Sequence, residues 1–475
     1  MRFTVIGHAS LYIETDGPEG AGTGPTILID PWLFGSCYWR SWWHFAPQEE
    51  LRPEWLAPDY LYLTHHHFDH FHYPSMRRID KGTHVLVSKF GVDVMGGEVR
   101  SLGFEQLTEL PHGEITTLAP GVRVASYQYG FDDTAFVVAD GDDVVADLND
   151  CKIRGRALDQ VAFDFGHPTF MFKTHSWAQS YPIGYEAEDP ADLTLLSRHT
   201  YIEDFVGAAE QLQPRYAVPF ANMVAFLHPE SRWVNPNLIT PDEVRTEFEA
   251  AAGVERTELK VLSPGDVWSS GSGFELTGHD WFADPDTALA ARAEEAREAL
   301  ERCAEEEEGV TLSWDAFSAY LGDFLQDLPP LMPRVLLKRP VVFEVPSSAE
   351  PYWVVDFRHR SVTRDAEPPD DRASLIQINE AVLADAIDKR ILHFTHGGMR
   401  IHVKLRPGGA SGDLAFWGVL MVWEIGYLPV HRLLRPRFLS ALWRRRREAY
   451  DAVAGLRGPG TPLERLAGGF ASTET

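Results

Sequence analysis

Apolar and polar residues alternate in short runs over the first 270 residues of the chain. A period of two residues, typical of strands with one buried face, recurs in segments separated by turns rich in Gly and Pro. These predicted strands cover residues 2–6, 10–14, 26–29, 61–63, 84–88, 122–129, 134–139, 143–147 and 216–220. Helical patterns occur at residues 73–79 and 200–213. This alternation predicts an α/β fold in which two sheets are stacked between layers of helices, an αββα sandwich.

The pattern changes between residues 270 and 310. Residues 285–309 include the run EEAREALERCAEEEEG, which predicts a solvated acidic helix whose charge needs no functional explanation. Beyond it, strands are expected at residues 341–345, 353–357 and 402–405, and a helix at 379–388. We therefore predict a sandwich domain over residues 1–270, an acidic helical linker over 271–309, and a smaller α+β domain over 310–475 that ends in a basic helix.

Composition narrows the classes of protein that fit. The length of 475 residues suits two or three domains, and fourteen tryptophans argue against a disordered chain. The net charge of −27 excludes a general nucleic-acid binder, because phosphate binding relies on clustered Lys and Arg. The longest uncharged apolar stretch, residues 414–423, is about half of a membrane span. With an N-terminus that reads as a strand and three widely spaced cysteines, a cytoplasmic protein without a membrane segment is expected.

The C-terminal tail has the opposite charge to the rest of the chain. Residues 432–457 are basic, with four consecutive arginines at 444–447. Leu434, Phe438, Leu442 and Tyr450 have the spacing of an amphipathic helix. We expect this helix to pack against an acidic surface of the same protein or of a second copy in a homo-oligomer. Docking of an anionic ligand or partner is the alternative.

The strongest chemical signal is a cluster of five histidines and one aspartate in residues 64–72. It directly follows the apolar run at 61–63, so a strand end delivers these side chains to one rim of a sheet. Imidazole nitrogen suits zinc, iron, copper and nickel, and a carboxylate adds a harder ligand. His65, His67, Asp69 and His70 form the pattern His-x-His-x-Asp-His, and we predict that all four bind metal. His66 and His72 fall outside the pattern and are expected to support the ligands or lie at the surface.

Two later segments offer further ligands. Asp150 lies where a turn begins after a predicted strand, a position from which a carboxylate bridges two metals or completes the site of one. Asp147 is the alternative, but it lies within the strand. His228 is the candidate for a final ligand, because its loop would return to the rim where the others lie; a histidine capping a surface loop is the alternative. His8 either lines the site or is a satisfied loop histidine.

The histidine pattern is the signature of the metallo-β-lactamase fold, and the chain as a whole resembles the CMP-N-acetylneuraminate hydroxylase family in the part beyond its Rieske domain. The similar segments keep their order along the chain: residues 65–74, 133–134, 150–151, 212–215, 219–221, 228–229, 352–357 and 396–405. The resemblance implies a metallo-β-lactamase sandwich followed by a smaller α+β domain. It also implies an aspartate, Asp30, that braces a ligand histidine from the end of an early strand.

The chain departs from that family in two respects. A Rieske cluster needs Cys-x-His pairs, and none of Cys37, Cys151 and Cys303 has a histidine two residues later. Electrons for an oxygenase would therefore come from a separate electron-transfer protein or from the substrate. The fold also usually takes a histidine from the loop near residues 129–133, which is absent here. Either the site holds one metal, or a substitute replaces that histidine; the candidates are Tyr129, Asp132 and His175.

Two reactions fit these residues. The resemblance implies an iron-dependent oxygenase in which His65, His67 and either Asp150 or His228 hold mono- or dinuclear iron. Its substrate would be a small polar molecule such as a nucleotide-linked sugar, an amino sugar or a natural-product intermediate. The alternative is a zinc hydrolase of an ester, amide, lactone or phosphoester, with Asp69 as the base or water-orienting group. A protein that keeps the fold for binding only is disfavoured by the intact pattern.

Two further sets of side chains suit a substrate site. Residues 34–47 are unusually aromatic and form either a lid packed on the core or a wall of the substrate pocket. Four cationic or titratable side chains are available to bind an anionic group, although surface charges are usually solvated: Lys173, Arg198, His199 and Arg215.

Overall fold

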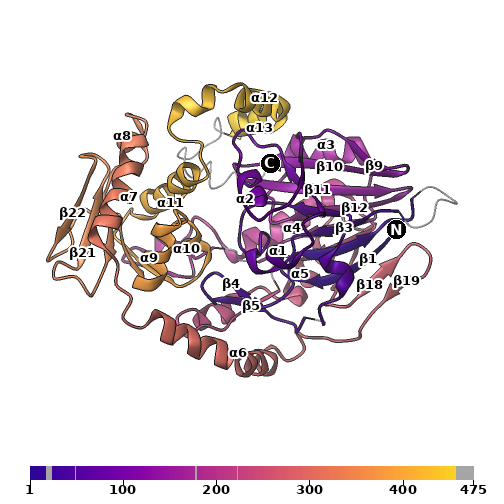
Figure 1. Ribbon diagram of the computed structural model, residues 1–475, viewed down its shortest axis with the longest axis horizontal. Coiled ribbons are helices and arrows are strands. Elements are labelled where there is room, and N and C mark those ends of the chain that lie inside the picture. Colours follow the sequence, from indigo (N-terminus) through magenta and orange to yellow (C-terminus); the bar gives the residue numbers. More distant parts are fainter. Residues whose placement is uncertain (18–23, 49, 177–178, 222, 456–475) are drawn as a thin grey trace.

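The structure, a computed structural model, describes residues 1–17, 24–48, 50–176, 179–221 and 223–455. Its N-terminal part is a sandwich of two sheets (Figure 1). The first sheet has the order β19-β18-β1-β2-β3-β6-β7-β8. Its strands are β1 (Arg2–Gly7), β2 (Ser10–Glu14), β3 (Thr26–Ile29), β6 (Tyr60–Leu63), β7 (His84–Ser88), β8 (Gln106–Leu110), β18 (Val267–Ser269) and β19 (Gly273–Glu275).

The second sheet has the order β17-β15-β13-β12-β11-β10-β9. Its strands are β9 (Thr116–Ala119), β10 (Val122–Tyr129), β11 (Asp133–Asp140), β12 (Asp143–Asn149), β13 (Phe170–Lys173), β15 (Tyr216–Pro219) and β17 (Glu258–Leu259). Phe3, Tyr62 and Phe136 are buried between the two sheets, and the rings of Tyr62 and Phe136 stack at 3.6 Å. Because both inner faces are apolar, the sheets exclude water from the space between them.

Helices cover both outer faces, so the predicted αββα sandwich is confirmed. The first sheet is covered by α1 (Tyr73–Arg78) and α2 (Gly96–Ser101), through Met76 and Val99 among others. The second is covered by α3 (Gly155–Phe165), α4 (Arg198–Leu212) and α5 (Pro241–Ala250). Capping boxes begin both α4 and α5, because their capping hydroxyls accept from backbone N–H groups that have no partner within the helix.

A third sheet forms the core of the C-terminal part, with the order β14-β24-β23-β20-β21-β22. Its strands are β14 (Tyr185–Ala187), β20 (Val341–Glu344), β21 (Tyr352–Asp356), β22 (Ser361–Asp365), β23 (Ser374–Ile378) and β24 (Ile401–Leu405). It packs against three helices: α7 (Trp314–Asp327), α9 (Glu380–Asp388) and α11 (Ala410–Glu424). β14 comes from the middle of the sandwich sequence and pairs in parallel with β24. The edge strand of the third sheet therefore comes from the first 270 residues, and the order of the chain alone does not tell which sheet a strand joins.

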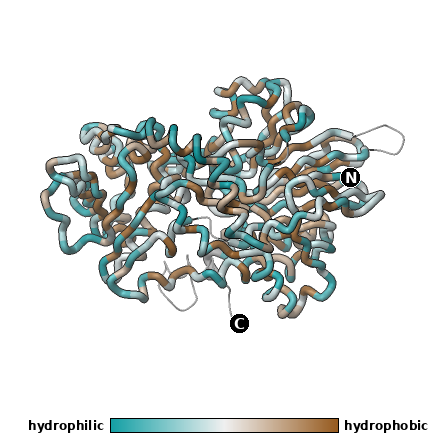
Figure 2. Tube along the Cα trace, turned by 90° about the horizontal axis from the view of Figure 1, so that it is seen from below, coloured by the Kyte–Doolittle hydropathy of each residue, from teal (hydrophilic) through white to brown (hydrophobic). Residues whose placement is uncertain are grey.

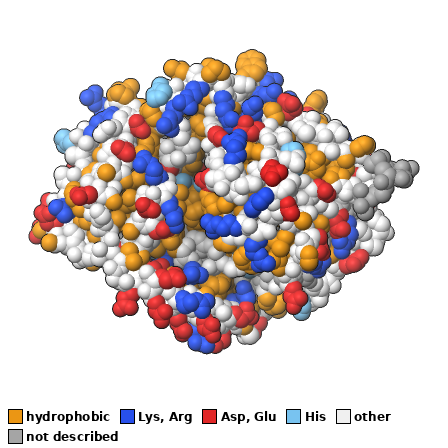
Figure 3. Space-filling view, viewed as in Figure 1, with side chains coloured by type: hydrophobic (Ala, Val, Ile, Leu, Met, Phe, Trp, Pro, Cys, Tyr) orange, Lys and Arg blue, Asp and Glu red, His pale blue; other side chains and the backbone are white. Residues whose placement is uncertain are grey.

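The predicted acidic helix is present as α6 (Pro285–Glu307) and runs along the lower edge of the molecule, where acidic side chains gather (Figures 1 and 3). It is not solvated all round. Ala296, Leu300 and Cys303 are buried on one face, against a cluster that includes Trp43 and Phe45. Figure 2 shows brown apolar segments running through the interior of both parts. The helix thus belongs to the core as well as to the surface.

The aromatic insertion lies between the two parts of the molecule. It forms β4 (Ser36–Cys37) and β5 (Trp42–His44), which extend a small sheet with β16 (Val224–Phe226). Trp39 donates its indole N–H to Asp385 Oδ2 at 2.8 Å, and Trp42 donates to Gly397 O at 3.1 Å. The insertion therefore joins the sandwich to the C-terminal part instead of covering it as a surface lid.

The basic tail forms α12 (Pro436–Arg444) and α13 (Arg446–Gly455), which lie on the sandwich. Arg437 pairs with Glu109, and Arg444 lies 3.0 Å from Glu114 Oε2. The expected packing against acidic residues of the same chain is confirmed. In the part of the chain that the structure describes, no helix combines the length and apolar character needed to cross a membrane.

Candidate metal centre

A tight turn after β6 gathers the histidine cluster at one rim of the sandwich. The backbone N–H groups of His70 and Phe71 both donate to His67 O, at 3.0 and 2.7 Å. Along a strand, alternate side chains would point to opposite faces of the sheet. The turn instead brings the side chains of the four residues of the sequence pattern close together. The cluster is therefore a compact group and not an extended row.

The first group of potential ligands is His65, His67 and Asp150. One ligand atom from each lies within 4.8 Å of the other two, and His65 Nε2 is 2.8 Å from His67 Nδ1. Asp150 reaches the group because Asn149, at the end of β12, has a φ of +47° and turns the chain. Asparagine tolerates this left-handed conformation better than most residues. His67 and Asp150 are half-buried, so this group opens toward solvent.

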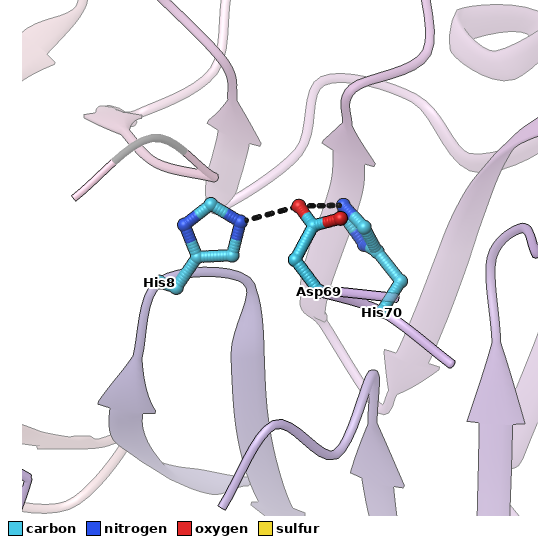
Figure 4. A group of neighbouring side chains, drawn as sticks. All are labelled: His8, Asp69 and His70. Atoms are coloured by element: carbon cyan, nitrogen blue, oxygen red, sulfur yellow. Dashed lines mark hydrogen bonds and ion pairs between the residues drawn. The ribbon is translucent and has the colours of Figure 1, made fainter. Parts of the chain in front are cut away.

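The second group is His8, Asp69 and His70 (Figure 4). His8 Nε2 lies 2.8 Å from Asp69 Oδ2, and His70 Nε2 lies 3.2 Å from the same oxygen. Asp69 Oδ1 accepts from the Tyr38 hydroxyl at 2.8 Å. His8 has a φ of +36°, a strained conformation for a histidine that the surrounding structure must enforce. Of the two interpretations of His8, the structure supports the one in which His8 lines the site.

Asp30 forms hydrogen bonds with a member of the second group and with the chain neighbours of two members of the first group. Its carboxylate accepts from His70 Nδ1 at 2.7 Å, from Asn149 Nδ2 at 2.7 Å, and from the backbone N–H and hydroxyl of Thr64 at 2.9 and 2.6 Å. Asp30 is fully buried and has a φ of +44°. Asp30 thus braces a histidine, as the resemblance implies, and that histidine is His70: an acceptor at Nδ1 leaves Nε2 directed at Asp69 and Asp150.

The electrostatics of the centre favour a bound cation. Burial holds the pKa of His65 and of His67 at about 3, so both rings are neutral at pH 7, the form that binds metal. Burial alone would raise the pKa of Asp150, but the hydrogen bond and charge of His70 bring it to about 2. His70 pairs with Asp30, Asp69 and Asp150 at once, and these carboxylates raise its pKa against the effect of burial. Several buried carboxylates therefore meet at His70, and a bound cation would balance their negative charge.

The donor set fits a divalent metal. Asp150 Oδ1 is buried and makes no hydrogen bond within the described structure, and His70 Nε2 meets only the carboxylates of Asp69 and Asp150. Buried polar atoms are nearly always satisfied, so unpartnered atoms of this kind suggest a missing partner. Nitrogen and carboxylate oxygen are ligands that both zinc and iron accept. The residues present thus suit a metal ion, and their chemistry does not choose between the two.

His228 lies outside this centre. Its ligand atoms group instead with those of Cys303 and Glu307 on α6, within 4.8 Å of one another. Burial and the nearby Arg400 lower the pKa of His228 to about 4. The predicted role of His228 as a final ligand is therefore corrected: its loop follows β16, which pairs with β5, and returns to the linker helix and not to the rim.

The loop position that usually carries a histidine is occupied differently. Tyr129 interacts with Arg154. Within the described residues, neither Asp132 nor His175 belongs to a cluster with the predicted ligands. Asp133 does reach the first group: its Oδ1 lies 3.7 Å from His65 Nδ1. Sequence reasoning missed Asp133 as a site residue, although it begins β11 next to a named candidate.

The proposed anion-binding side chains are engaged elsewhere. Arg198 bonds to Glu243, and His199 pairs with Glu203 and Glu247. Lys173 is fully buried and lies 2.8 Å from Asp204 Oδ2. Arg215 lies over the ring of Tyr216. These contacts stabilise the fold around α4 and α5 and do not direct the side chains toward the centre.

Comparison with known proteins agrees with this geometry. Residues 2–162 match the family model described as "Beta-lactamase superfamily domain". This match covers the first third of the chain. His8, the His65–His70 pattern and Asp150 all lie inside the matched part, whereas His175 and His228 lie beyond it. The superfamily match therefore covers both groups of potential ligands.

Two curated relatives extend the similarity beyond that domain. A protein named putative Rieske 2Fe-2S iron-sulfur protein from Mycobacterium tuberculosis is 31% identical over 265 residues, covering 51% of this chain and 49% of the relative. Cytidine monophosphate-N-acetylneuraminic acid hydroxylase from Danio rerio is 22% identical over 228 residues, covering 44% and 37%. The chain matches about half the length of the first of these and less of the second. The resemblance to the hydroxylase family is thus confirmed.

Solved structures match a similar share of the chain. CmlA, a diiron β-hydroxylase from Streptomyces venezuelae, is 20% identical with a TM-score of 0.38, and the match covers 55% of this chain and 53% of CmlA. Metal-dependent hydrolases overlap to a similar extent. Hydroxylases and metal-dependent hydrolases both occur among these neighbours.

Proposed function

We propose that this protein is an iron-dependent oxygenase that hydroxylates a small polar substrate. The observation that carries the proposal is the group formed by His65, His67 and Asp150, two imidazoles and one carboxylate within 4.8 Å of one another. This donor set corresponds to the two-His-one-carboxylate arrangement of non-haem iron oxygenases, which leaves positions open for oxygen and substrate. His8, Asp69 and His70 would hold a second ion in a dinuclear centre.

The chain's own residues prepare the site for this chemistry. Iron bound there would supply the activation of oxygen. Asp30 fixes the orientation of His70, and Tyr38 with His8 fixes Asp69. Because His70 and Asp69 are held by buried hydrogen bonds, these two ligands need little reorganisation when a metal binds.

The cysteines of this chain cannot form the iron-sulfur cluster that would supply electrons to an oxygenase. Cys37, Cys151 and Cys303 are buried, separate and free, and none is followed by a histidine two residues later. They cannot form the Cys-x-His pairs of a Rieske cluster. We therefore propose that a separate electron-transfer protein or the substrate provides the electrons. A nucleotide-linked sugar, an amino sugar or a natural-product intermediate is the substrate class that the hydroxylase relatives support.

A zinc hydrolase is the second candidate. The compact pair of groups favours it, because two metals held there by His65, His67 and Asp150 and by His8, Asp69 and His70 would supply the Lewis-acid chemistry of ester or phosphoester hydrolysis. In that case Asp69 would act as a ligand and not as the base the sequence suggests. Interaction with His70 and His8 holds the pKa of Asp69 well below its usual range despite burial, so it is a poor proton acceptor.

Oxygen uptake distinguishes the two reactions. The protein would be loaded with ferrous iron, supplied with ascorbate, and compared with zinc-loaded protein given bis(p-nitrophenyl) phosphate and p-nitrophenyl acetate. The oxygenase predicts iron-dependent oxygen uptake that His67→Ala abolishes and that His359→Ala, at an exposed histidine, leaves unchanged. Turnover only by the zinc-loaded protein would replace the oxygenase with the hydrolase.

A further inference from the structure

Helix α12 carries apolar side chains on its outward side as well as on its inward side. Inward, Ala441 is buried and Phe438 lies against Gly91 and the ring of Tyr427. Four large apolar side chains in or just before the helix are exposed instead: Leu434 (73%), Leu439 (50%), Leu442 (47%) and Trp443 (71%). A group of exposed apolar side chains of this kind marks a surface that meets another molecule or a membrane.

Arginines flank this apolar face. Arg435 directly precedes α12, and Arg446 begins α13 and lies over the ring of Trp443 at 5.6 Å. Within the described part of the chain, neither arginine forms an ion pair with a carboxylate. Arg437 and Arg444, by contrast, pair with glutamates of the sandwich. The tail thus uses two arginines to hold itself on the sandwich and leaves two others available to a partner outside the chain.

A second segment, in the C-terminal part, has the same character. Leu331 and Val335, before and within α8 (Met332–Val335), are 68% and 61% exposed. Arg334 and Lys338 are exposed beside them and form no ion pair among the described residues. Figure 1 places α8 and α12 along the upper edge of the molecule, and Figure 3 shows hydrophobic and Lys or Arg side chains interspersed along that edge. The acidic side chains of α6 lie at the opposite edge.

This arrangement fits a flat anionic surface better than a protein. A protein partner is held by one continuous apolar core with a polar rim, whereas these two apolar groups belong to separate elements that project from one edge. A plane can contact both. Exposed Leu and Trp beside Arg is the composition with which amphipathic helices lie in a membrane interface. The net charge of −27 does not oppose this contact, because charges are screened beyond about 8 Å at physiological ionic strength and the local cations dominate.

We propose that this edge binds the surface of a membrane that contains anionic lipid. Leu439, Leu442 and Trp443 enter the boundary between headgroups and acyl chains, and Arg435 and Arg446 pair with the lipid phosphates. The segment around α8 makes a second contact, which fixes the orientation of the protein on the surface. The contact is peripheral, so it needs no membrane-spanning helix, and it does not depend on which reaction the metal centre performs.

Vesicle flotation with the full-length protein tests the contact of α12. The protein should float with vesicles of phosphatidylcholine that contain about one third phosphatidylglycerol, and not with phosphatidylcholine alone. The double variant Leu439→Ser, Trp443→Ser should lose this binding. Arg435→Gln with Arg446→Gln should weaken it about 25-fold, because each cation near an anionic membrane strengthens binding about fivefold. Binding to both kinds of vesicle alike, or to neither, would overturn the proposal.

The α8 contact and the matched controls use exposed side chains of the same types. Leu331→Ser with Val335→Ser should weaken binding at least 5-fold. Leu276→Ser, after β19, and Arg302→Gln, on α6, change exposed residues away from the upper edge and should bind as the wild-type protein does. Urea unfolding should be alike for all variants. If the two controls weakened binding as much as the α8 or α12 variants, the surface would not be the one proposed.

Fluorescence and oligomeric state distinguish a membrane from other occupants. Brominated lipid in the anionic vesicles should quench the tryptophan fluorescence of the wild-type protein more than that of Trp443→Phe, which keeps an apolar ring and should still bind. Equal quenching would show that residue 443 stays outside the membrane and would overturn the proposal. So would a dimer in solution that Leu439→Ser with Trp443→Ser dissociates, because a second copy would then cover the face.

Discussion

Replacing Asp30 should lower both the free energy of unfolding and the affinity of the centre for metal. Asp30 Oδ1 accepts from the Thr64 backbone, while Oδ2 accepts from His70, Asn149 and the Thr64 hydroxyl. In Asp30→Asn an amide nitrogen stands where Oδ2 was. It faces two nitrogen donors, His70 Nδ1 and Asn149 Nδ2, that it cannot satisfy. The hydroxyl of Thr64 rotates and accepts, so only the two nitrogen contacts are lost.

The size of the effect follows from those two contacts. A hydrogen bond to a charged group contributes about 1.5–3 kcal/mol, so the loss of two in Asp30→Asn should lower the free energy of unfolding by about 3–6 kcal/mol. Removing the partner that orients a ligand histidine typically costs about 10- to 100-fold in metal affinity. Asp30→Ala should unfold more easily still, because it also leaves the Thr64 backbone N–H unpaired in a fully buried site.

Urea denaturation and metal competition measure the two effects separately. Zinc affinity would be read from competition with a chromophoric chelator under conditions in which each variant is folded. Asp59→Asn is the matched control, because Asp59 also accepts from a backbone N–H, that of Thr26, but at an exposed site. If Asp30→Asn bound zinc as tightly as the wild-type protein, the bracing of His70 would have no part in metal binding and the reasoning would fail.

Three further predictions concern other contacts. His8→Ala should reduce bound metal from two ions to one per chain, measured by mass spectrometry, because it removes a donor from one group only; unchanged stoichiometry would exclude His8 as a ligand. Arg400→Ala should lower the free energy of unfolding by about 3 kcal/mol in urea, since it leaves Glu230 and Glu307 unpaired at the junction with α6; Arg40→Ala, at an exposed ion pair, should have little effect. Burial raises the pKa of Asp413 to about 6, above its unfolded value, so the folded state binds the extra proton and loses about 1.4 kcal/mol as the pH rises from 5 to 8. Asp413→Asn should abolish this part of the pH dependence of urea unfolding, and an unaltered dependence would assign it to other groups.

Local patterns predicted most of the sandwich correctly. The strands at 10–14, 26–29 and 84–88 match β2, β3 and β7 to the residue. These segments succeed because their alternation is set by burial on one or both faces, which a sequence shows directly. The partner of a strand is not visible in this way. β14 has three residues and joins β24 across more than 200 residues of chain, so no local pattern identifies its sheet.

The candidate centre shows the same division. His65, His67, Asp69 and His70 are close in sequence, and their spacing predicts that they meet. His8 and Asp133 come from strand ends elsewhere in the chain, and only the pairing of the strands brings them to the rim. His228 failed for the converse reason: its type and loop suited a ligand, but the pairing of β16 with β5 carries it to α6. Loop direction depends on tertiary pairing, which sequence patterns do not contain.

The most direct test of the account is the metal content of protein purified without oxygen and without added metal, measured by mass spectrometry. The account predicts one or two iron ions per chain, bound through the groups around His65 and His70, and their loss in His65→Ala. Near-stoichiometric zinc in place of iron would contradict the oxygenase. No bound metal in the native protein, and none taken up afterwards, would contradict the metal centre itself.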